Sequence, residues 1–493
     1  MNSLIESMTE KDSLTLNGAV TNSTTHNYNV DLFFLAGACR NESEENIKLA
    51  LAKSYGFNRE NTLKIIFWAG DIRQGAGERR FFKLAMNWLY LVYREDFYKY
   101  FDKVAEFSRW DVLFDFADDK KVMEYIVKNF KEGNALLCKW LPRKAKTKDK
   151  WTVEKREGNT TVKTIKTKTR TVKNGFALKL RKALGWNEKQ YRQHLVKYTK
   201  VVEQNMCAKD WSSIEYSKVP SVALNKYNKA WYRNDEERFT QYIEDVKSGK
   251  SKINASVIFP HDIIKSVIDI GGWNVRINAL NDAQVTQWNN LPNYLSGINS
   301  ILPVVDTSGS MFGYGGLPAY IALSLGLYIS ERNEGCFKDA FITFSETPVM
   351  QYLKGDLNQR LQELAHAEWG SNTNLLGVFD TILTKAVENK ISEEEMPRMI
   401  LIISDMEFDS CARLTNYESI KMRYMSAGYQ LPKIVFWNVN GRAKNLPVTV
   451  NDIGVALVSG ASPSIIKSVL SGDIDPVKVM ENTILKERYA FLK

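Results

Sequence analysis

Residues 301–310 indicate both the fold class and a candidate site, and their sequence is Ile301-Leu302-Pro303-Val304-Val305-Asp306-Thr307-Ser308-Gly309-Ser310. Its first five residues, which are apolar, predict a buried strand over Ile301–Val305, and the polar residues after them predict a tight loop. Open α/β sheets bind their ligands at this carboxyl edge. Asp306, Ser308 and Ser310 would place one carboxylate and two hydroxyls there. Hard oxygen donors of this kind suit Mg²⁺ or Mn²⁺ better than zinc.

Two later segments supply further candidates for the same cation. Thr373 lies in Gly370-Ser371-Asn372-Thr373-Asn374, and Asp405 follows the apolar run Met399–Ile403 and Ser404. The order of these groups along the chain resembles the metal-ion-dependent adhesion site of von Willebrand factor A domains. In both, a carboxylate and two hydroxyls come first, a threonine follows, and an aspartate comes last. The resemblance implies one divalent ion, Mg²⁺ or alternatively Mn²⁺ or Ca²⁺, and one metal position open to an acidic side chain of a protein partner. The ligands it implies are Asp306, Ser308 and Ser310, with Thr373 and Asp405 binding directly or through water. The alternative for Asp-x-Ser-x-Ser alone is a helix N-cap.

Apolar segments with the length of strands alternate with helical patterns throughout residues 300–493. Strands are predicted at Ile301–Val305, Ala340–Ser345, Met399–Ser404, Lys433–Asn438 and Gly454–Ser459. Helices are predicted at Pro318–Glu331, Leu357–His366, Leu375–Glu388, Tyr417–Ala427 and Pro463–Leu470. This alternation predicts a mainly parallel sheet with helices on both faces, that is, a doubly wound, Rossmann-like α/β domain over 300–493.

The preceding part of the chain has a helical pattern, which ends with Asn274–Trp288. Helix, glycine-rich turn, helix is the unit of a HEAT-like α-solenoid, so residues 28–299 are predicted to form a helical-repeat domain. Gly75-x-Gly77 lacks a preceding strand and the phosphate-loop spacing, which favours a helix end and a turn. Residues 1–27 are rich in Ser, Thr and Asn and are predicted to be a flexible leader.

Positive charge is concentrated in the N-terminal part. Residues 300–493 contain 18 Lys and Arg against 22 Asp and Glu, whereas residues 1–299 contain 49 against 35. Lysine alternating with Thr, Val and Ile predicts a basic β-hairpin within an insertion at about 143–175, with most lysines on one face. Such a face binds phosphates; the alternative is a solvated insertion. The candidate RNA-binding residues are Lys144, Lys146, Lys148, Lys150, Trp151, Lys163, Lys166, Lys168, Arg170 and Lys173.

Several short sequence motifs resemble motifs of Ro-type RNA-binding proteins, which contain the TROVE module. They are Ala69–Arg79, Ser108–Leu113 and Lys139–Pro142. Phe259–His261, Ser404–Asp409 and Ile434–Asn438 resemble more specifically an uncharacterised Ro-like branch found in plants, fungi and viruses. The resemblance implies a horseshoe of helical repeats, closed into a monomeric ring by a von Willebrand A domain. It also implies binding of small structured or misfolded RNA, including single-stranded ends, and no catalysis.

Three functions follow, and the leading one is a non-enzymatic RNA-binding ring. The second is a metal-dependent protein-interaction adaptor, and the third is a two-metal nuclease built on Asp306, Asp405, Glu407 and Asp409. No apolar run is long enough to span a membrane. Five scattered cysteines and the lack of a signal peptide predict a reduced, cytoplasmic protein.

Overall fold

The computed structural model divides the chain into two compact units. It describes residues 13–143, 146–157, 160–171, 175–271, 274–295, 300–343, 348, 350–365, 373–410, 415–470 and 474–493. One unit combines Met1–Val92 with Glu215–Lys493, and the other is Tyr93–Ile214. The sequence placed one boundary near residue 300, but the structure joins the first 92 residues to the C-terminal sheet. The predicted ring stays a prediction.

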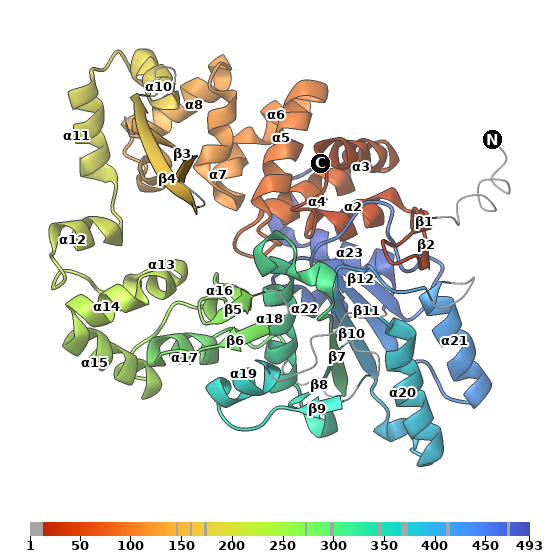
Figure 1. Ribbon diagram of the computed structural model, residues 1–493. Coiled ribbons are helices and arrows are strands. Elements are labelled where there is room, and N and C mark those ends of the chain that lie inside the picture. The colour runs from red at the N-terminus through yellow and green to blue at the C-terminus, as the bar shows by residue number, and fades with distance from the viewer. Residues whose placement is uncertain are drawn as a thin grey trace. The chain divides into compact units, whose positions relative to one another are not determined.

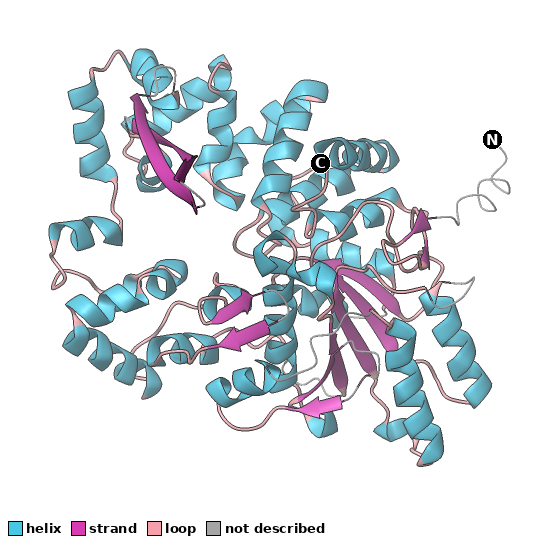
Figure 2. Cartoon of the chain, viewed as in Figure 1, coloured by secondary structure: helices cyan, strands magenta, loops and turns pink. Residues whose placement is uncertain are grey.

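The core of the first unit is a six-stranded sheet in the order β12-β11-β10-β7-β8-β9 (Figure 2). Its strands are β7 (Ile301–Val305), β8 (Ala340–Thr343), β9 (Met350–Tyr352), β10 (Met399–Ser404), β11 (Lys433–Asn438) and β12 (Val455–Ser459). Neighbouring strands run parallel except at the edge, where β9 is antiparallel to β8. Every residue of β7, β10 and β12 is buried, as expected when both faces of a sheet are covered.

The helices of the α/β domain follow the alternation that the sequence predicts. They are α18 (Leu317–Arg332), α19 (Leu357–Ala365), α20 (Leu375–Glu388), α21 (Asn416–Ala427), α22 (Ile466–Leu470) and α23 (Pro476–Ile484) (Figure 1). α18 packs against β7, β8 and β10. Gly326 allows this close packing, because a Cβ there would lie 2.3 Å from Val305 Cγ2.

Four N-terminal helices complete the first unit beside the sheet. They are α2 (Tyr28–Ala36), α3 (Glu44–Phe57), α4 (Arg59–Gly70) and α5 (Arg79–Val92). α2 packs against β12, and Gly37 at its end donates its backbone N–H to Ser459 Oγ at 3.0 Å. Ser459 Oγ donates in turn to the Phe33 carbonyl at 2.9 Å. These helices therefore share a core with the α/β domain.

Residues 215–295 also belong to this unit and differ in one place from the expected pattern. Their helices are α13 (Ser221–Lys226), α14 (Asn228–Asn234), α15 (Glu236–Lys247), α16 (Pro260–Ile264) and α17 (Asp282–Asn289). The helix predicted over Asn274–Trp288 is wrong in its first part. Asn274–Ile277 is strand β6, antiparallel to β5 (Ile268–Gly271), and α17 starts only after a capping box at Asn281.

The predicted flexible leader is also wrong for the residues that the structure describes. Strands β1 (Ser13–Leu14) and β2 (Val20–Thr21) pair with each other as a hairpin. The next residues bind α2, because Asp31 accepts hydrogen bonds from Thr24 Oγ1 at 2.6 Å and the Thr25 backbone N–H at 2.8 Å. Residues 1–12 lie outside the described part of the chain.

The second unit consists mainly of short helices and one long hairpin. The helices are α6 (Arg94–Tyr100), α7 (Val104–Phe107), α8 (Lys120–Lys131), α9 (Ala135–Trp140), α10 (Phe176–Leu184), α11 (Glu188–Tyr198) and α12 (Val202–Ala208), with a 3-10 helix at Trp110–Phe116. The hairpin pairs β3 (Lys146–Glu157) with β4 (Thr160–Thr171). In the described residues of both units, no helix combines the length and hydropathy needed to cross a membrane.

Candidate metal site at the carboxyl edge of the sheet

The parallel pairing of β7 and β10 brings two predicted metal ligands to the same edge. Val305 pairs with Ile403, and the Asp306 backbone N–H extends this ladder by donating to the Ile403 carbonyl at 3.0 Å. Asp306 and Asp405 therefore follow neighbouring strands directly. Ser404 Oγ donates to Asp306 Oδ2, so the end of β10 orients the carboxylate at the end of β7.

The two serines of the Asp-x-Ser-x-Ser motif belong to this same cluster. The Ser308 backbone N–H donates to Asp306 Oδ1 at 2.9 Å, and Ser308 Oγ lies 3.1 Å from Ser310 Oγ. Ser308 precedes a short 3-10 helix, Gly309–Phe312, but its side chain makes no capping hydrogen bond. The helix-cap alternative is therefore not realised, and the hydroxyls remain with the carboxylates.

The two carboxylates are buried close enough to perturb each other. Asp306 is 0% exposed and Asp405 is 2% exposed. Burial and then the neighbouring Asp306 and Glu407 charges raise the pKa of Asp405 to about 8, against a hydrogen bond from Ser310 that lowers it. Burial is also the main cause that raises the pKa of Asp306, with a contribution from Asp409.

No basic side chain of the described residues pairs with Asp306 or Asp405. Leaving an ionised carboxylate buried without a positive partner costs several kcal/mol. A bound divalent cation would remove this cost, and carboxylate and hydroxyl oxygens are the donors that Mg²⁺ and Ca²⁺ use. Within the described ranges there is no group of three or more His, Cys, Asp and Glu side chains suited to a metal. The donor set thus fits a hard cation and relies on hydroxyls as well as carboxylates.

Thr373 reaches this edge through Asp409. The Thr373 backbone N–H donates to Asp409 Oδ2 at 2.8 Å, and the Asp409 backbone N–H donates to the Thr373 carbonyl at 3.1 Å. The Thr373 side chain is fully buried, and its Oγ1 lies 3.4 Å from Asn17 Nδ2. Sequence reasoning missed the roles of Ser404 and Asn17, although Ser404 could have been suspected from its position beside Asp405.

Glu407 is engaged by positive and hydrogen-bonding partners, unlike the carboxylate pair. Arg442 Nε donates to Glu407 Oε1 at 3.1 Å, and the Leu16 backbone N–H donates to Glu407 Oε2 at 2.6 Å. Both Glu407 oxygens are thus occupied, while Asp409 holds the Thr373 backbone. The arrangement disfavours a second metal on Glu407 and Asp409, which the nuclease alternative requires.

The Gly-rich segment Ala69–Arg79 is hydrogen-bonded to residues near the C-terminal end of the first unit. Asp71 is 0% exposed and accepts hydrogen bonds from Arg488 Nη2 and Tyr489 Oη, both at 3.0 Å. A Cβ at Gly75 would lie 1.9 Å from the Trp68 carbonyl oxygen, so glycine is required there. The segment is a turn between α4 and α5 held by the C-terminus, as the turn interpretation predicted.

Two of the motifs that resemble Ro-type proteins, Ser108–Leu113 and Lys139–Pro142, are in contact in the second unit. The Arg109 guanidinium lies 3.4 Å from the centre of the Trp140 ring, which joins Ser108–Leu113 to Lys139–Pro142. Arg109 also pairs with Asp111 at 2.8 Å.

The predicted hairpin is confirmed, because β3 pairs with β4 in an antiparallel register that runs from Lys146–Thr171 to Glu157–Thr160. The predicted turn near Gly158-Asn159 lies outside the described residues. The candidate residues Lys146, Lys148, Lys150 and Trp151 belong to β3, and Lys163, Lys166, Lys168 and Arg170 belong to β4. The expected single lysine face concerns side chains outside the described part of the structure, and it stays a prediction. Lys144 and Lys173 lie outside the described residues.

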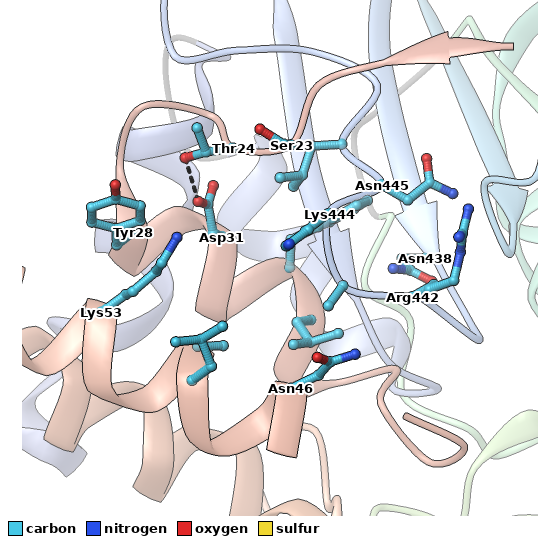
Figure 3. A pocket seen from close by; sticks show the side chains of 16 residues that line it. Ser23, Thr24, Tyr28, Asp31, Asn46, Lys53, Asn438, Arg442, Lys444 and Asn445 are labelled. Carbon is cyan, nitrogen blue, oxygen red and sulfur yellow. Dashed lines mark hydrogen bonds between the residues drawn. The ribbon is translucent and has the colours of Figure 1, made fainter. Parts of the chain in front are cut away.

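A separate pocket of about 70 Å³ lies between α2, α3 and the loop after β11 (Figure 3). Its lining includes Tyr28, Asp31, Lys53 and Lys444. Burial is the main cause that raises the pKa of Asp31, and Lys53 Nζ lies 5.1 Å from the centre of the Tyr28 ring. None of the five predicted metal ligands lines this pocket, so it is not part of the candidate metal site.

The fold and the site define a class: a helical protein whose C-terminal α/β domain presents a carboxylate–hydroxyl cluster at the carboxyl edge of its sheet. The family model described as "Domain of unknown function (DUF2828)" matches residues 15–93 and 94–296, which is more than half of the chain. The chain therefore belongs to this family. A second model, "Domain of unknown function (DUF7788)", matches residues 299–488.

Two individual proteins are similar to the chain. Uncharacterized protein L728 of Acanthamoeba polyphaga mimivirus is 30% identical in an alignment of 318 residues, which covers 60% of this chain and 54% of the relative. The chain thus spans about half the length of this curated relative. The crystal structure of Deinococcus radiodurans RO (RSR) protein aligns with 94% of this chain and 99% of its own, at 13% identity and a TM-score of 0.37. At this TM-score the alignment does not establish a common fold.

Proposed function

We propose that the chain is a non-enzymatic binding protein whose α/β domain, resembling a von Willebrand A domain, holds one Mg²⁺ ion. Asp306, Ser308 and Ser310 would hold the ion, with Thr373 and Asp405 binding directly or through water. The observation that carries this proposal is the buried Asp306–Asp405 pair, which no described basic side chain neutralises. The ion would supply positive charge and a position for an oxygen ligand from a partner.

Metal titration of the full chain tests this proposal. Mg²⁺ at one hundred times its dissociation constant should stabilise the wild type by about 2.7 kcal/mol over the EDTA-treated protein. Asp306→Asn should abolish that gain. Asp118→Asn, which removes the same charge at a side chain that is 86% exposed, should keep it. Equal Mg²⁺ stabilisation of Asp306→Asn and the wild type would refute the site.

RNA is the ligand we propose for the basic second unit. The observation behind this choice is the β3–β4 ribbon, whose two strands contain nine Lys and Arg residues against three Asp and Glu residues. Such a ribbon neutralises phosphates without reading sequence, and Trp151 could stack on a base of a single-stranded end.

A salt titration with labelled RNA tests the ribbon. Replacing Lys163, Lys166 and Lys168 by Glu should weaken binding of a single-stranded RNA and reduce the slope of log affinity against log salt by about 2. The matched control replaces Lys120, Lys218 and Lys385, whose side chains are 90%, 76% and 69% exposed, by Glu. If both triple variants lose the same affinity, net charge rather than the ribbon governs binding.

A further inference from the structure

The N-terminal hairpin has a defined tip built around Asn17. Ser13 pairs with Thr21 and Leu14 with Val20. The Thr15 backbone N–H donates to the Ala19 carbonyl at 2.9 Å, and the Gly18 backbone N–H donates to the Thr15 carbonyl at 3.1 Å. Gly18 has φ of +84°, a conformation that glycine adopts without strain. The hairpin therefore presents Leu16-Asn17-Gly18 at its end.

This tip is docked on the loop that follows β10. Thr15 Oγ1 donates to the Phe408 carbonyl at 2.6 Å, and Asn17 Nδ2 donates to the Glu407 carbonyl at 2.7 Å. Gly18 forms an isolated bridge with Asp409, the residue that holds the Thr373 backbone. The tip thus lies against the same loop that supplies Asp405 to the candidate site.

A second loop, after β11, holds the stem of the hairpin. Arg442 Nη2 donates to the Leu14 carbonyl at 2.9 Å, while Arg442 Nε binds Glu407. Thr21 Oγ1 and the Asn22 backbone N–H donate to the Leu446 carbonyl at 2.9 and 3.0 Å. Arg442 therefore links the hairpin, Glu407 and the end of the sheet.

Hydrogen bonds make most of the contacts described for the hairpin, and its buried apolar residue is the small Ala19, which is 2% exposed. Leu14 and Leu16 are 55% and 70% exposed, so these two leucines contribute little apolar burial. Each hydrogen bond contributes a net of only about 1 kcal/mol. A segment held in this way can be displaced by a competitor that makes the same hydrogen bonds and adds one stronger contact.

We infer that the hairpin tip occupies, within the chain itself, the surface on which a partner loop reaches the metal. This inference rests on the proposed Mg²⁺ site. The side-chain amide of Asn17 lies 3.4 Å from Thr373 Oγ1, one of the proposed ligands, and an amide is the neutral counterpart of an aspartate. The partner that fits this surface is a turn with Asp or Glu at its tip. Its backbone would replace the hairpin's hydrogen bonds to Glu407 and Phe408, and its carboxylate would add a bond to the cation.

Substituting Asn17 by Asp tests whether the tip faces the metal. In the full chain, Asn17→Asp should bind Mn²⁺ about tenfold more tightly than the wild type, because an added carboxylate strengthens a hard-cation site. It should also lower the water-proton relaxation enhancement of bound Mn²⁺, since the carboxylate displaces a water. Asn41→Asp, which adds the same charge at another exposed asparagine of this unit, should change neither quantity.

A second variant and a second measurement protect the test against misfolding of Asn17→Asp. Asn17→Ala should keep the wild-type Mn²⁺ affinity and bind glutarate more tightly in the Mn²⁺-loaded state. In the wild type, glutarate with Mn²⁺ should speed hydrogen exchange of residues 13–21 but not of β7 and β10. Identical Mn²⁺ and glutarate binding by the wild type and both Asn17 variants refutes the role of the hairpin. Failure of the wild type to bind Mn²⁺ refutes the metal site instead, and the inference that rests on it.

Discussion

The buried His261 provides a sharp test of the structure, because its charge is excluded from the core of the first unit. His261 in α16 is 6% exposed, and within the described residues its Nδ1 has no hydrogen-bond partner. Burial lowers the pKa of His261 from 6.5 to about 4. The nearby Asp262 opposes this shift, whereas Arg40 and Lys265 add to it.

The sign and size of the pH effect follow from this shift. Between about pH 6.5 and pH 4 the unfolded chain binds a proton at His261 and the folded chain does not, so stability falls as the pH falls. Each pH unit in this window costs about 1.4 kcal/mol, which gives a loss of about 2 kcal/mol between pH 6.5 and pH 5. Above about pH 7.5 both states are unprotonated at His261, and its contribution no longer changes with pH.

Urea unfolding of the wild type and His261→Leu at several pH values measures this cost. The difference in unfolding free energy between the two proteins should change by about 2 kcal/mol in favour of the variant between pH 7.5 and pH 5. Carboxylates that titrate in both proteins cancel in the difference. Parallel curves for the wild type and His261→Leu would refute the burial of a neutral imidazole.

Three further outcomes test the joints of the first unit. Asp71→Asn should cost about 3–5 kcal/mol in a urea titration, because it leaves Arg488 with a neutral partner in a buried site; a loss below about 1 kcal/mol would contradict that joint. Gly37→Ala should cost about 1–3 kcal/mol, since its Cβ would lie 2.6 Å from the Ser459 carbonyl carbon. Gly56→Ala, with no atom within 4 Å of its Cβ, is the matched control and should stabilise α3 by about 0.5–1 kcal/mol. The isolated segment 300–493 should lack a near-UV circular dichroism signal that the full chain shows, because α2 covers β12; a native-like spectrum would contradict the shared core.

The sequence predicts the α/β domain well where burial and period determine the structure. Ile301–Val305, Met399–Ser404 and Lys433–Asn438 are strands with the predicted bounds, since each is an apolar run that ends at a polar residue. The position of Asp306 beside Asp405 also follows, because parallel neighbouring strands carry their C-terminal residues to one edge. The pattern of apolar and polar residues within each segment is therefore sufficient to predict these strands and the proximity of the two aspartates.

Local pattern does not reveal pairings between distant segments. Asp71 and Arg488 are separated by 417 positions, and neither has a neighbour in sequence that indicates the other. The β1–β2 hairpin could have been predicted from the dipeptide Asn17-Gly18, which favours a hairpin turn. The high Ser, Thr and Asn content of residues 1–27 led instead to the prediction of a flexible leader. The single lysine face stays a prediction, because the alternation of Lys with Thr, Val and Ile does not determine the register on which such a face depends.

The missed hairpin changes how the predicted site should be understood. If the α/β domain is considered alone, its carboxyl edge is expected to be open to solvent. This edge carries Asp306, Ser308, Ser310 and Asp405. Instead, Asn17 Nδ2 lies 3.4 Å from Thr373 Oγ1, and the Leu16 backbone N–H donates to Glu407 Oε2. Residues 16 and 17 therefore lie on the edge where we propose that the cation and its partner bind. Metal binding and partner access are therefore separate steps in the proposed function. The buried carboxylates determine the first, and the polar contacts of the hairpin determine the second.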